Sequence, residues 1–166
     1  KYDGNQYHQY YCVDDSLGLP DNNITDIYRD SHNRLWVATV NGVCLYQANG
    51  NFKRVSINGN NKNIEKILED KEGRIFLLTI TDLYQYDEKN NKAITKLSKM
   101  VEKNCYNYSC HIDRKDVMWI VTSYSVKGYR TQDLKLIVQS PVQSYPIASF
   151  LLDGHQLYIS GYNGMQ

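Results

Sequence analysis

A repeat of about forty residues is the feature that most limits how this 166-residue chain can fold. Residues 24–46 recur as residues 64–86 at a constant offset of 40, and no gap is needed to align them. A third copy follows at a further offset of 43, and a partial fourth keeps the phase over residues 147–159. The recurring slots hold an Asp, an aromatic ring between apolar residues, a Thr and a Tyr: Asp30, Asp70 and Asp113; Trp36, Phe76, Trp119 and Tyr158; Thr39, Thr79 and Thr122; Tyr46, Tyr86 and Tyr129.

Each unit has the composition of short antiparallel strands. Runs of β-branched and aromatic residues are bounded by Asn, Asp and Gly, which predicts strands joined by tight turns. The apolar spacing of residues 94–101 also fits a short amphipathic helix, but the phase of the repeat favours an outer strand and its exit loop there. We therefore predict a strand for this segment.

The turn after the first strand begins with Asp in all three complete units. Turns 30–33, 70–73 and 113–116 end on Asn, Gly and Asp, which tolerate a positive φ. An initial Asp can accept hydrogen bonds from the backbone two residues on, and a final left-handed residue lets the second strand leave antiparallel. These aspartates are therefore predicted to be structural.

A period of this length, with about four short strands and one aromatic ring per unit, is typical of β-propeller blades, whose sheets bury their faces against one another. We predict an all-β chain of about four blades, each a four-stranded antiparallel sheet, forming a segment of a larger propeller. The predicted divisions are the outer strands of one blade at 1–18, blades at 19–58, 59–101 and 102–142, and the inner strands of a blade at 143–166.

The first full unit has a specific motif. It reads Gly-Leu-Pro-Asp-Asn-Asn-Ile at 18–24, Asp30, Leu-Trp-Val-Ala-Thr at 35–39, Asn-Gly-Val at 41–43 and Tyr46. This closely resembles the two-component regulator propeller repeat, which reads roughly L-P-x-N-x-I, D-x-x-G-x-L-W-I-G-T and G-L-x-x-Y. The resemblance is clear in the second unit and weaker afterwards. The departures are Asn33 for the first Gly, Ala38 and Leu78 for the second Gly, and the first strand of the third unit at 106–110.

The resemblance implies a place in the periplasmic sensor region of an inner-membrane hybrid two-component system, as in Bacteroides-like bacteria. Such regions carry many more blades than this chain. They sense ligands, often glycan-derived oligosaccharides, and control genes for polysaccharide use through a membrane helix and a cytoplasmic histidine kinase. The expected function is therefore ligand sensing in signal transduction and not catalysis, with an oligosaccharide or other small ligand as the partner.

The ends of the chain continue the repeat across the join. Residues 163–166 followed by 1–3 superpose without a gap on residues 41–47, so residues 1–18 could complete a blade with 147–159 if the two ends meet. Because exposed strand edges invite pairing, three outcomes are open: a four-bladed ring, a larger ring with a second copy, or a segment whose neighbouring blades lie elsewhere. We favour the segment. The expected protein partners are other blades of the same protein or a second copy, which would make a homodimer.

Charge and hydropathy exclude several classes of partner. Nineteen Lys and Arg against 18 Asp and Glu give a net charge of +1 without a basic stripe, so no nucleic acid is expected to bind this segment. The longest apolar runs, such as residues 75–80, are far shorter than the ~20 residues that span a bilayer. The N-terminal Lys-Tyr-Asp-Gly lacks the features of a signal peptide, which indicates a mature chain or an excised segment.

Candidate ligand contacts lie in two sets of loops. In a propeller, the loops into the innermost strand and those between the second and third strands surround the central channel on one face, where ligands commonly bind. By phase, six polar residues fall in these loops: Asn22, Asn23, Asn41, Asn63, Tyr124 and Asn163. Turn chemistry alone is an alternative role for the asparagines. Exposed rings among the fifteen tyrosines would suit stacking on sugar faces.

We expect neither a metal nor a cofactor. The four cysteines form no C-x-x-C pair, and the four histidines are scattered. Cys105 and Cys110 could close a short loop in an oxidising compartment or stay reduced, and both states are left open.

Two other functions are alternatives. A propeller glycosidase or lyase is the more distant one: the turn at Asp30 resembles the Asp-box of sialidases, but two residues separate Asp30 from Asn33 where an Asp-box has one. No pair of carboxylates stands out as acid and base. A protein-interaction propeller is the nearer alternative, and it would have a flat, apolar channel mouth in place of a concave, polar one.

Overall fold

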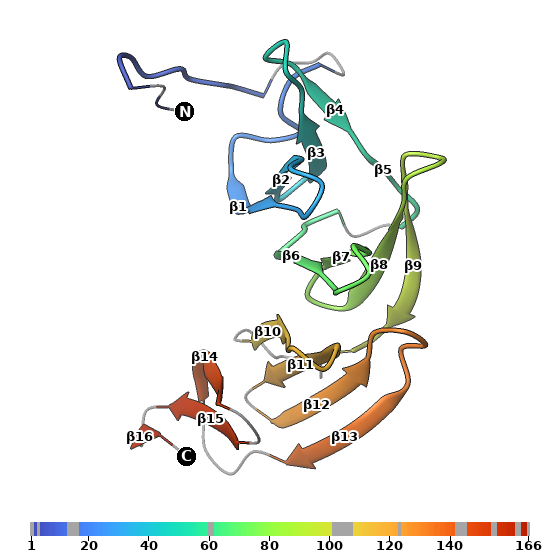
Figure 1. The fold of residues 1–166 in the computed structure, drawn as a ribbon. Helices are drawn as coiled ribbons and strands as arrows, with labels where there is room; N and C mark the ends of the chain where they lie inside the picture. Colours follow the sequence, from blue (N-terminus) through green and yellow to red (C-terminus); the bar gives the residue numbers. More distant parts are fainter. Residues whose placement is uncertain are drawn as a thin grey trace.

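The computed structural model describes residues 2, 4–12, 17–59, 62–100, 108–122, 124–141, 146–153, 156–161 and 164–165. All regular structure in these residues is β-strand. They include no helix that is long and apolar enough to cross a membrane. Four sheets follow one another along the chain and are arranged in an arc (Figure 1).

Each sheet corresponds to one sequence repeat. The first contains β1 (Ile24–Arg29), β2 (Leu35–Thr39), β3 (Gly42–Tyr46) and β4 (Phe52–Arg54), in that order. The second contains β6 (Lys66–Glu69), β7 (Ile75–Leu78), β8 (Asp82–Asp87) and β9 (Lys92–Ser98), with β5 (Ser56–Ile57) added parallel to β9. The third contains β10 (Tyr108–Ile112), β11 (Val117–Thr122), β12 (Ser125–Arg130) and β13 (Leu136–Pro141). The fourth contains β14 (Pro146–Asp153), β15 (Gln156–Gly161) and β16 (Gly164–Met165). The predicted all-β fold of four-stranded antiparallel propeller blades is confirmed.

The segment that could have been a helix is a strand. Residues 92–98 form β9, which pairs antiparallel with β8 over six positions of register. Lys99 follows with a φ of 58°, which ends the extended conformation. The helical alternative is therefore wrong for residues 92–98, because their pairing with β8, and not their apolar spacing, determines the conformation.

The hydrophobic core lies between successive sheets. Trp36, Val43 and Leu45 of the first sheet are buried against Ile64, Ile67, Ile75, Leu77 and Tyr84 of the second. Leu68, Phe76, Leu78 and Leu83 of the second sheet are buried in the same way against Cys110, Met118 and Ile120 of the third. Each blade thus buries one face against the next blade, which is why a single repeat has too little core to fold alone.

The β1–β2 turn is built around the side chain of Asp30. Its Oδ1 accepts hydrogen bonds from the backbone N–H groups of His32 (3.0 Å) and Arg34 (2.8 Å). Its Oδ2 accepts from Arg34 Nε (2.6 Å) and from the indole Nε1 of Trp36 (2.8 Å). Asn33 completes the turn with a φ of 63°. The carboxylate therefore ties the turn to the aromatic residue of the next strand.

The same turn recurs in the next two blades. Asp70 and Asp113 each accept from the backbone N–H groups two and four residues later, at 2.8–3.1 Å. Gly73 and Asp116 hold the positive φ, at 76° and 60°. The structural role predicted for the three aspartates is confirmed.

Asp30 is expected to make stability depend on pH. Burial raises the pKa of its carboxyl, but hydrogen bonds from Trp36 and Arg34 and the charge of Arg34 outweigh burial and hold the pKa below its ordinary value. The stabilisation is present above the unfolded-state pKa of about 3.9 and is lost as the pH falls through the lower folded-state pKa. The difference in unfolding free energy between wild type and Asp30→Asn should therefore shrink as the pH falls from about 5 to about 2 in urea titrations. A constant difference would contradict this; Asp133→Asn, at an exposed position, serves as the control.

The two ends of the arc do not meet in this structure. Residues 4–12 lie beside the first sheet, and β16 lies at the opposite end of the arc, paired with β15 (Figure 1). The described N-terminal residues form two isolated bridges, Tyr2 with Tyr7 and Cys12 with Leu19. Closure of residues 1–18 onto the strands at 147–159 required the ends to meet, and that condition is not fulfilled.

Candidate functional site

The loops that were predicted to surround a channel lie at one end of the sheets. In the first sheet Ile24 pairs with Thr39 and Thr39 pairs with Gly42, so the start of β1 and the β2–β3 turn are adjacent. The Ile64 N–H donates to the Thr39 carbonyl at 3.2 Å, which brings the start of the second sheet to the same place. We term this surface the loop face and define it by residues 22–23, 40–41, 62–63, 80–81 and 124.

The sheets are aligned in the same sense along the arc. Their innermost strands contact one another in order, β1 with β6, β6 with β10 and β10 with β14. At the end opposite the loop face, Ser31 donates to Glu69 and the Lys71 N–H donates to Asp116 at 3.0 Å. The loop-face residues of the described blades therefore share one side of the arc, at the mouth of its concave interior.

A buried threonine shapes each turn of the loop face. Thr39 Oγ1 donates to the Gly42 carbonyl at 2.9 Å and accepts from the Asn41 N–H at 3.2 Å. Thr79 and Thr122 make the equivalent bonds in the second and third blades, at 2.9–3.3 Å. The recurrence of Thr at this slot was visible in the sequence, but its role in holding the turn was missed.

Two predicted ligand residues, Asn22 and Asn23, precede β1. The Cys12 N–H donates to Asn22 Oδ1 at 2.6 Å, and the Asn23 N–H donates to Asp21 Oδ1 at 2.8 Å. The Asn23 carbonyl accepts from the Val40 N–H at 3.2 Å. Turn chemistry thus accounts for the side chain of Asn22 and the backbone of Asn23, while both residues are exposed.

The next two predicted residues lie across the junction of the first two blades. Asn41 is exposed at the β2–β3 turn. Asn63 is half-buried, and its Nδ2 donates to Glu65 Oε1 at 2.7 Å. The structure therefore brings Asn23, Asn41 and Asn63 to one surface, as their phase in the repeat predicted.

Tyr124 occupies the β11–β12 turn of the third blade. Its backbone N–H donates to Thr122 Oγ1 at 3.2 Å, and its side chain is 47% exposed. An exposed ring on a turn fixed at both ends has the geometry to stack on a flat ligand. Asn163, the sixth predicted residue, lies outside the described residues.

A small cavity opens at the loop face beside Asn41. It has a volume of about 240 Å³ and extends along Gly42 and Val43 to Arg54, on the outer strand β4, and to Lys62, in the connection that leads to β6. The Arg54 guanidinium donates to the carbonyls of Gly18 (3.2 Å) and Leu19 (2.9 Å), which fixes its position. These two cations were not predicted as site residues, because one lies on an outermost strand and the other in a connection between blades.

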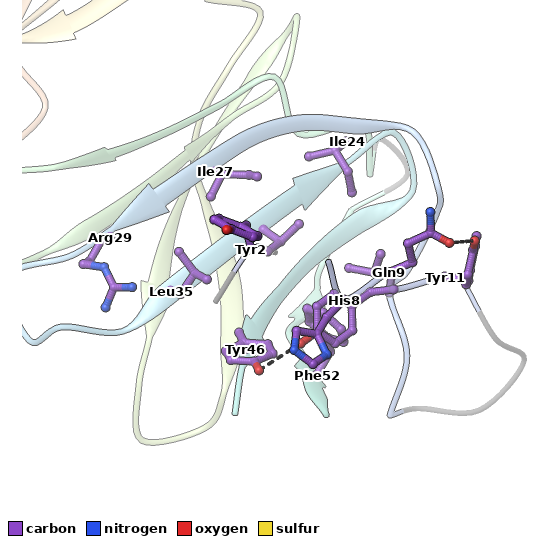
Figure 2. A pocket seen from close by; sticks show the side chains of 13 residues that line it. Tyr2, His8, Gln9, Tyr11, Ile24, Ile27, Arg29, Leu35, Tyr46 and Phe52 are labelled. Atoms are coloured by element: carbon purple, nitrogen blue, oxygen red, sulfur yellow. Dashed lines mark hydrogen bonds between the residues drawn. The ribbon is translucent and has the colours of Figure 1, made fainter. Parts of the chain in front are cut away.

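A larger cavity, of about 760 Å³, lies between the N-terminal segment and the first sheet. Figure 2 shows Ile24, Ile27, Arg29 and Leu35 of β1 and β2 on one wall, and His8, Gln9 and Tyr11 of the N-terminal segment on the other. Tyr10 also contributes, and its hydroxyl lies 3.0 Å from that of Tyr46. The hydrogen bond with Tyr46 and burial raise the pKa of Tyr10.

Burial lowers the reactivity of two thiols in the described part of the chain. Cys44 and Cys110 are buried, and burial raises the pKa of Cys44 to about 12 and that of Cys110 further. Such thiols stay protonated and unreactive at neutral pH. The pairing considered for Cys105 and Cys110 falls on a residue outside the described part of the chain. Across the residues that are described, no cluster of three or more His, Cys, Asp and Glu side chains could hold a metal ion.

One copy of the repeat matches a known family model. Residues 18–41, which span the lead-in to β1, the Asp30 turn, β2 and the Thr39 turn, match the family model of the two-component regulator propeller. Over these residues the chain is similar to the two-component regulator propeller repeat. The resemblance noted in the sequence is thereby confirmed for the first full unit. No curated protein sequence matches the chain.

Solved structures with the same fold include propellers of this type. Two extracellular domains from B. thetaiotaomicron, described as belonging to hybrid two component systems, superpose with TM-scores of 0.70 and 0.68 at 21% and 19% identity. The superpositions cover 90% and 96% of this chain but only 22% and 23% of those domains. The chain thus spans about a fifth of their length.

An enzyme shares the fold as well. Virginiamycin B lyase from Staphylococcus aureus superposes with a TM-score of 0.69 at 11% identity, over 89% of this chain and 52% of its own. At sequence identities this low, a superposition shows a shared propeller fold and nothing about function. It leaves the function of the repeat segment to be argued from its own residues.

Proposed function

We propose that this chain is a segment of an extracytoplasmic, periplasmic sensor propeller that binds a ligand for a two-component signalling system. The observation that carries the proposal is the match of residues 18–41 to the two-component regulator propeller. The fold shared with extracellular domains of hybrid two component systems supports it. Signalling would follow from differential affinity: a ligand that prefers one arrangement of the propeller and its partner shifts the equilibrium toward it.

The ligand site in this proposal is the loop face. Tyr124 supplies an exposed ring, Asn23 and Asn41 supply exposed amides, and the cavity beside Asn41 supplies a polar recess with Arg54 at its outer side. An oligosaccharide suits this combination, because sugars offer flat apolar faces for stacking and hydroxyls for hydrogen bonds. Control of genes for polysaccharide use is part of the same proposal.

The carboxylates of the repeat support a sensor over a hydrolase or lyase. Asp30 and Asp113 begin the turns that resemble an Asp-box in sequence, and both accept hydrogen bonds from their own turns and from Trp36 and Trp119. They lie at the end of the sheets opposite the loop face. They are therefore engaged in holding the fold and are not positioned as acid and base toward a bound sugar.

Substitution of Tyr124 tests the proposed site. A panel of oligosaccharides is screened for thermal stabilisation of the protein, and the affinity for the best glycan is measured by calorimetry. Loss of one stacking ring is expected to weaken binding by roughly 1–2 kcal/mol, or about tenfold, in Tyr124→Ala.

Tyr7→Ala is the matched control. Tyr7 is 81% exposed but belongs to the N-terminal segment, so its removal should leave glycan affinity unchanged. If no glycan class stabilises a monodisperse preparation, the oligosaccharide is the wrong ligand. Equal losses in both variants would exclude the loop face as the site.

A further inference from the structure

The second blade has a carboxylate beside the loop face, at a position where the first and third blades have none. The first unit has Gly42 at this position, and the offsets of the repeat make Asp82 and Ser125 its counterparts. Asp82 is the first residue of β8 and directly follows the β7–β8 turn. Because Gly and Ser form the same turn in the other two blades, the propeller fold does not require a carboxylate here.

The β7–β8 turn is held without the side chain of Asp82. Thr79 Oγ1 accepts from the backbone N–H groups of Thr81 (3.3 Å) and Asp82 (2.9 Å) and donates to the Asp82 carbonyl (3.2 Å). Thr122 makes the equivalent bonds in the third blade, where Ser125 takes the place of Asp82. All of these bonds are made to backbone groups, so the turn leaves the Asp82 carboxylate for another role.

The Asp82 carboxylate has a single local donor. Thr81 Oγ1 donates to Asp82 Oδ2 at 2.7 Å, with Thr81 exposed and Asp82 half-buried. Within the described residues, no Lys, Arg or His side chain forms an ion pair with Asp82. A carboxylate has about four lone-pair sites, so Asp82 can accept further hydrogen bonds from a ligand.

The direction of β8 turns the Asp82 side chain toward the first blade. Tyr84, two residues later, is buried in the core between the first two sheets, whereas Leu83 is buried against the third. Residues two apart in a strand share a face, so Asp82 lies on the side of Tyr84. Burial, and then the charge of Asp82, raise the pKa of Tyr84, which agrees with this placement. Asp82 therefore lies at the loop-face end of the junction that Asn41 also borders.

Thr81 and Asp82 together offer a ligand only hydrogen-bond acceptors. The Thr81 hydroxyl donates its proton to Asp82, so its oxygen can only accept, and a carboxylate has no donor. Hydroxyls on adjacent carbons of a sugar are donors that suit both oxygens. A uronate or sulfate has no donor for them, and the charge of Asp82 repels it. Glu65, which accepts from Asn63 at the same end of the blade, adds a second negative charge.

We propose that Thr81 and Asp82 form the hydroxyl-binding subsite of the loop face and select a neutral sugar unit with adjacent hydroxyls. The second blade lies between the first and the third, so a ligand that stacks on Tyr124 and reaches Asn41 passes this turn. The inference rests on the proposed function and adds two residues and a sugar class to its site.

Deoxy analogues of the glycan that best stabilises the protein test this subsite. Affinities are measured by calorimetry on the protein at its natural length. Asp82→Ala is expected to weaken binding about tenfold, because bonds to a charged acceptor are lost. Thr81→Val should weaken it about threefold, and Thr81→Ser should restore it. The analogue that lacks the bound hydroxyl should lose about tenfold with the wild type and nothing further with Asp82→Ala. A glycan with a uronate in this unit should bind the wild type about tenfold more weakly than the neutral one.

Asp87→Ala is the matched control. Asp87 is also half-buried on β8 and accepts one local bond, from Asn90 Nδ2 at 2.6 Å, but it lies at the opposite end of the strand. Its removal should leave glycan affinity unchanged. The melting temperature of Asp82→Ala should stay within about 2 °C of the wild type, because no bond of the turn uses the carboxylate.

The outcomes separate this subsite from the proposed function. Affinity that falls in Tyr124→Ala but not in Asp82→Ala overturns the subsite and leaves the proposed function standing. Equal losses of the deoxy analogue with the wild type and with Asp82→Ala also overturn it, as does a uronate glycan that binds as tightly as the neutral one. A panel in which no glycan binds the wild type overturns the proposed ligand and the subsite together.

Discussion

Asp30→Ala is expected to lower the free energy of unfolding by about 3–4 kcal/mol, one of the two largest effects of a single substitution in this chain. The carboxylate is buried and accepts four hydrogen bonds, two from backbone N–H groups and two from the side chains of Arg34 and Trp36. Its removal leaves the buried indole N–H of Trp36 and the Nε–H of Arg34 without their acceptor, while Arg34 Nη1 keeps its bond to Glu88. Urea denaturation followed by tryptophan fluorescence measures the loss.

The second blade provides the control for this substitution. Asp70 holds the equivalent turn, but Phe76 stands in the place of Trp36 and has no N–H to donate. Asp70→Ala is therefore expected to cost about 1 kcal/mol less than Asp30→Ala. Equal losses would mean that the bond to the indole contributes nothing and that the turn alone accounts for the effect.

Trp36→Ala is the other substitution with a large expected effect, about 3–5 kcal/mol. Trp36 is fully buried between the first and second sheets, and its ring packs edge-on against Tyr86 at 4.8 Å. Truncation leaves a cavity at the interface and removes an aromatic pair. Thermal and chemical denaturation both report this loss, with near-ultraviolet circular dichroism as a check on the packing.

Trp36→Phe separates packing from hydrogen bonding. It keeps an aromatic ring, as the second blade does with Phe76, and removes only the donor to Asp30 and part of the volume. The expected cost is about 1–2 kcal/mol. A loss as large as that of Trp36→Ala would contradict the assignment of most of the energy to packing between blades.

The sequence was sufficient to predict the elements that depend on local chemistry. The Asp30 turn was predictable because an Asx-type acceptor and a left-handed Asn33 act within five residues. Strand β9 was predictable because the phase of the repeat placed it beside β8. The loop-face position of Asn23, Asn41 and Asn63 followed from the same phase, since antiparallel strands return each turn to the same end of the sheet.

Features that depend on contacts between repeats were not predictable. The parallel pairing of β5 with β9 joins a connector to the neighbouring blade, and no pattern within residues 56–57 signals it. The cations beside Asn41 reach the site from an outer strand and a connection, which the phase of the inner strands does not describe. The exposure of Ile27 is likewise invisible in the sequence, because its side chain is of the same type as that of the buried Ile67.

The parallel strand β5 has a mechanical consequence. The Ser56 N–H donates to the Asn91 carbonyl and the Asn58 N–H donates to the Ala93 carbonyl, each at 3.2 Å. The segment that leaves the first blade is therefore hydrogen-bonded along the outer edge of the second blade. A force that pulls the two blades apart along the rim loads these bonds lengthwise and in parallel, and they must break together. The two blades would then move as one rigid body. A tilt of one blade would be passed on to the other, because the connection between them does not bend.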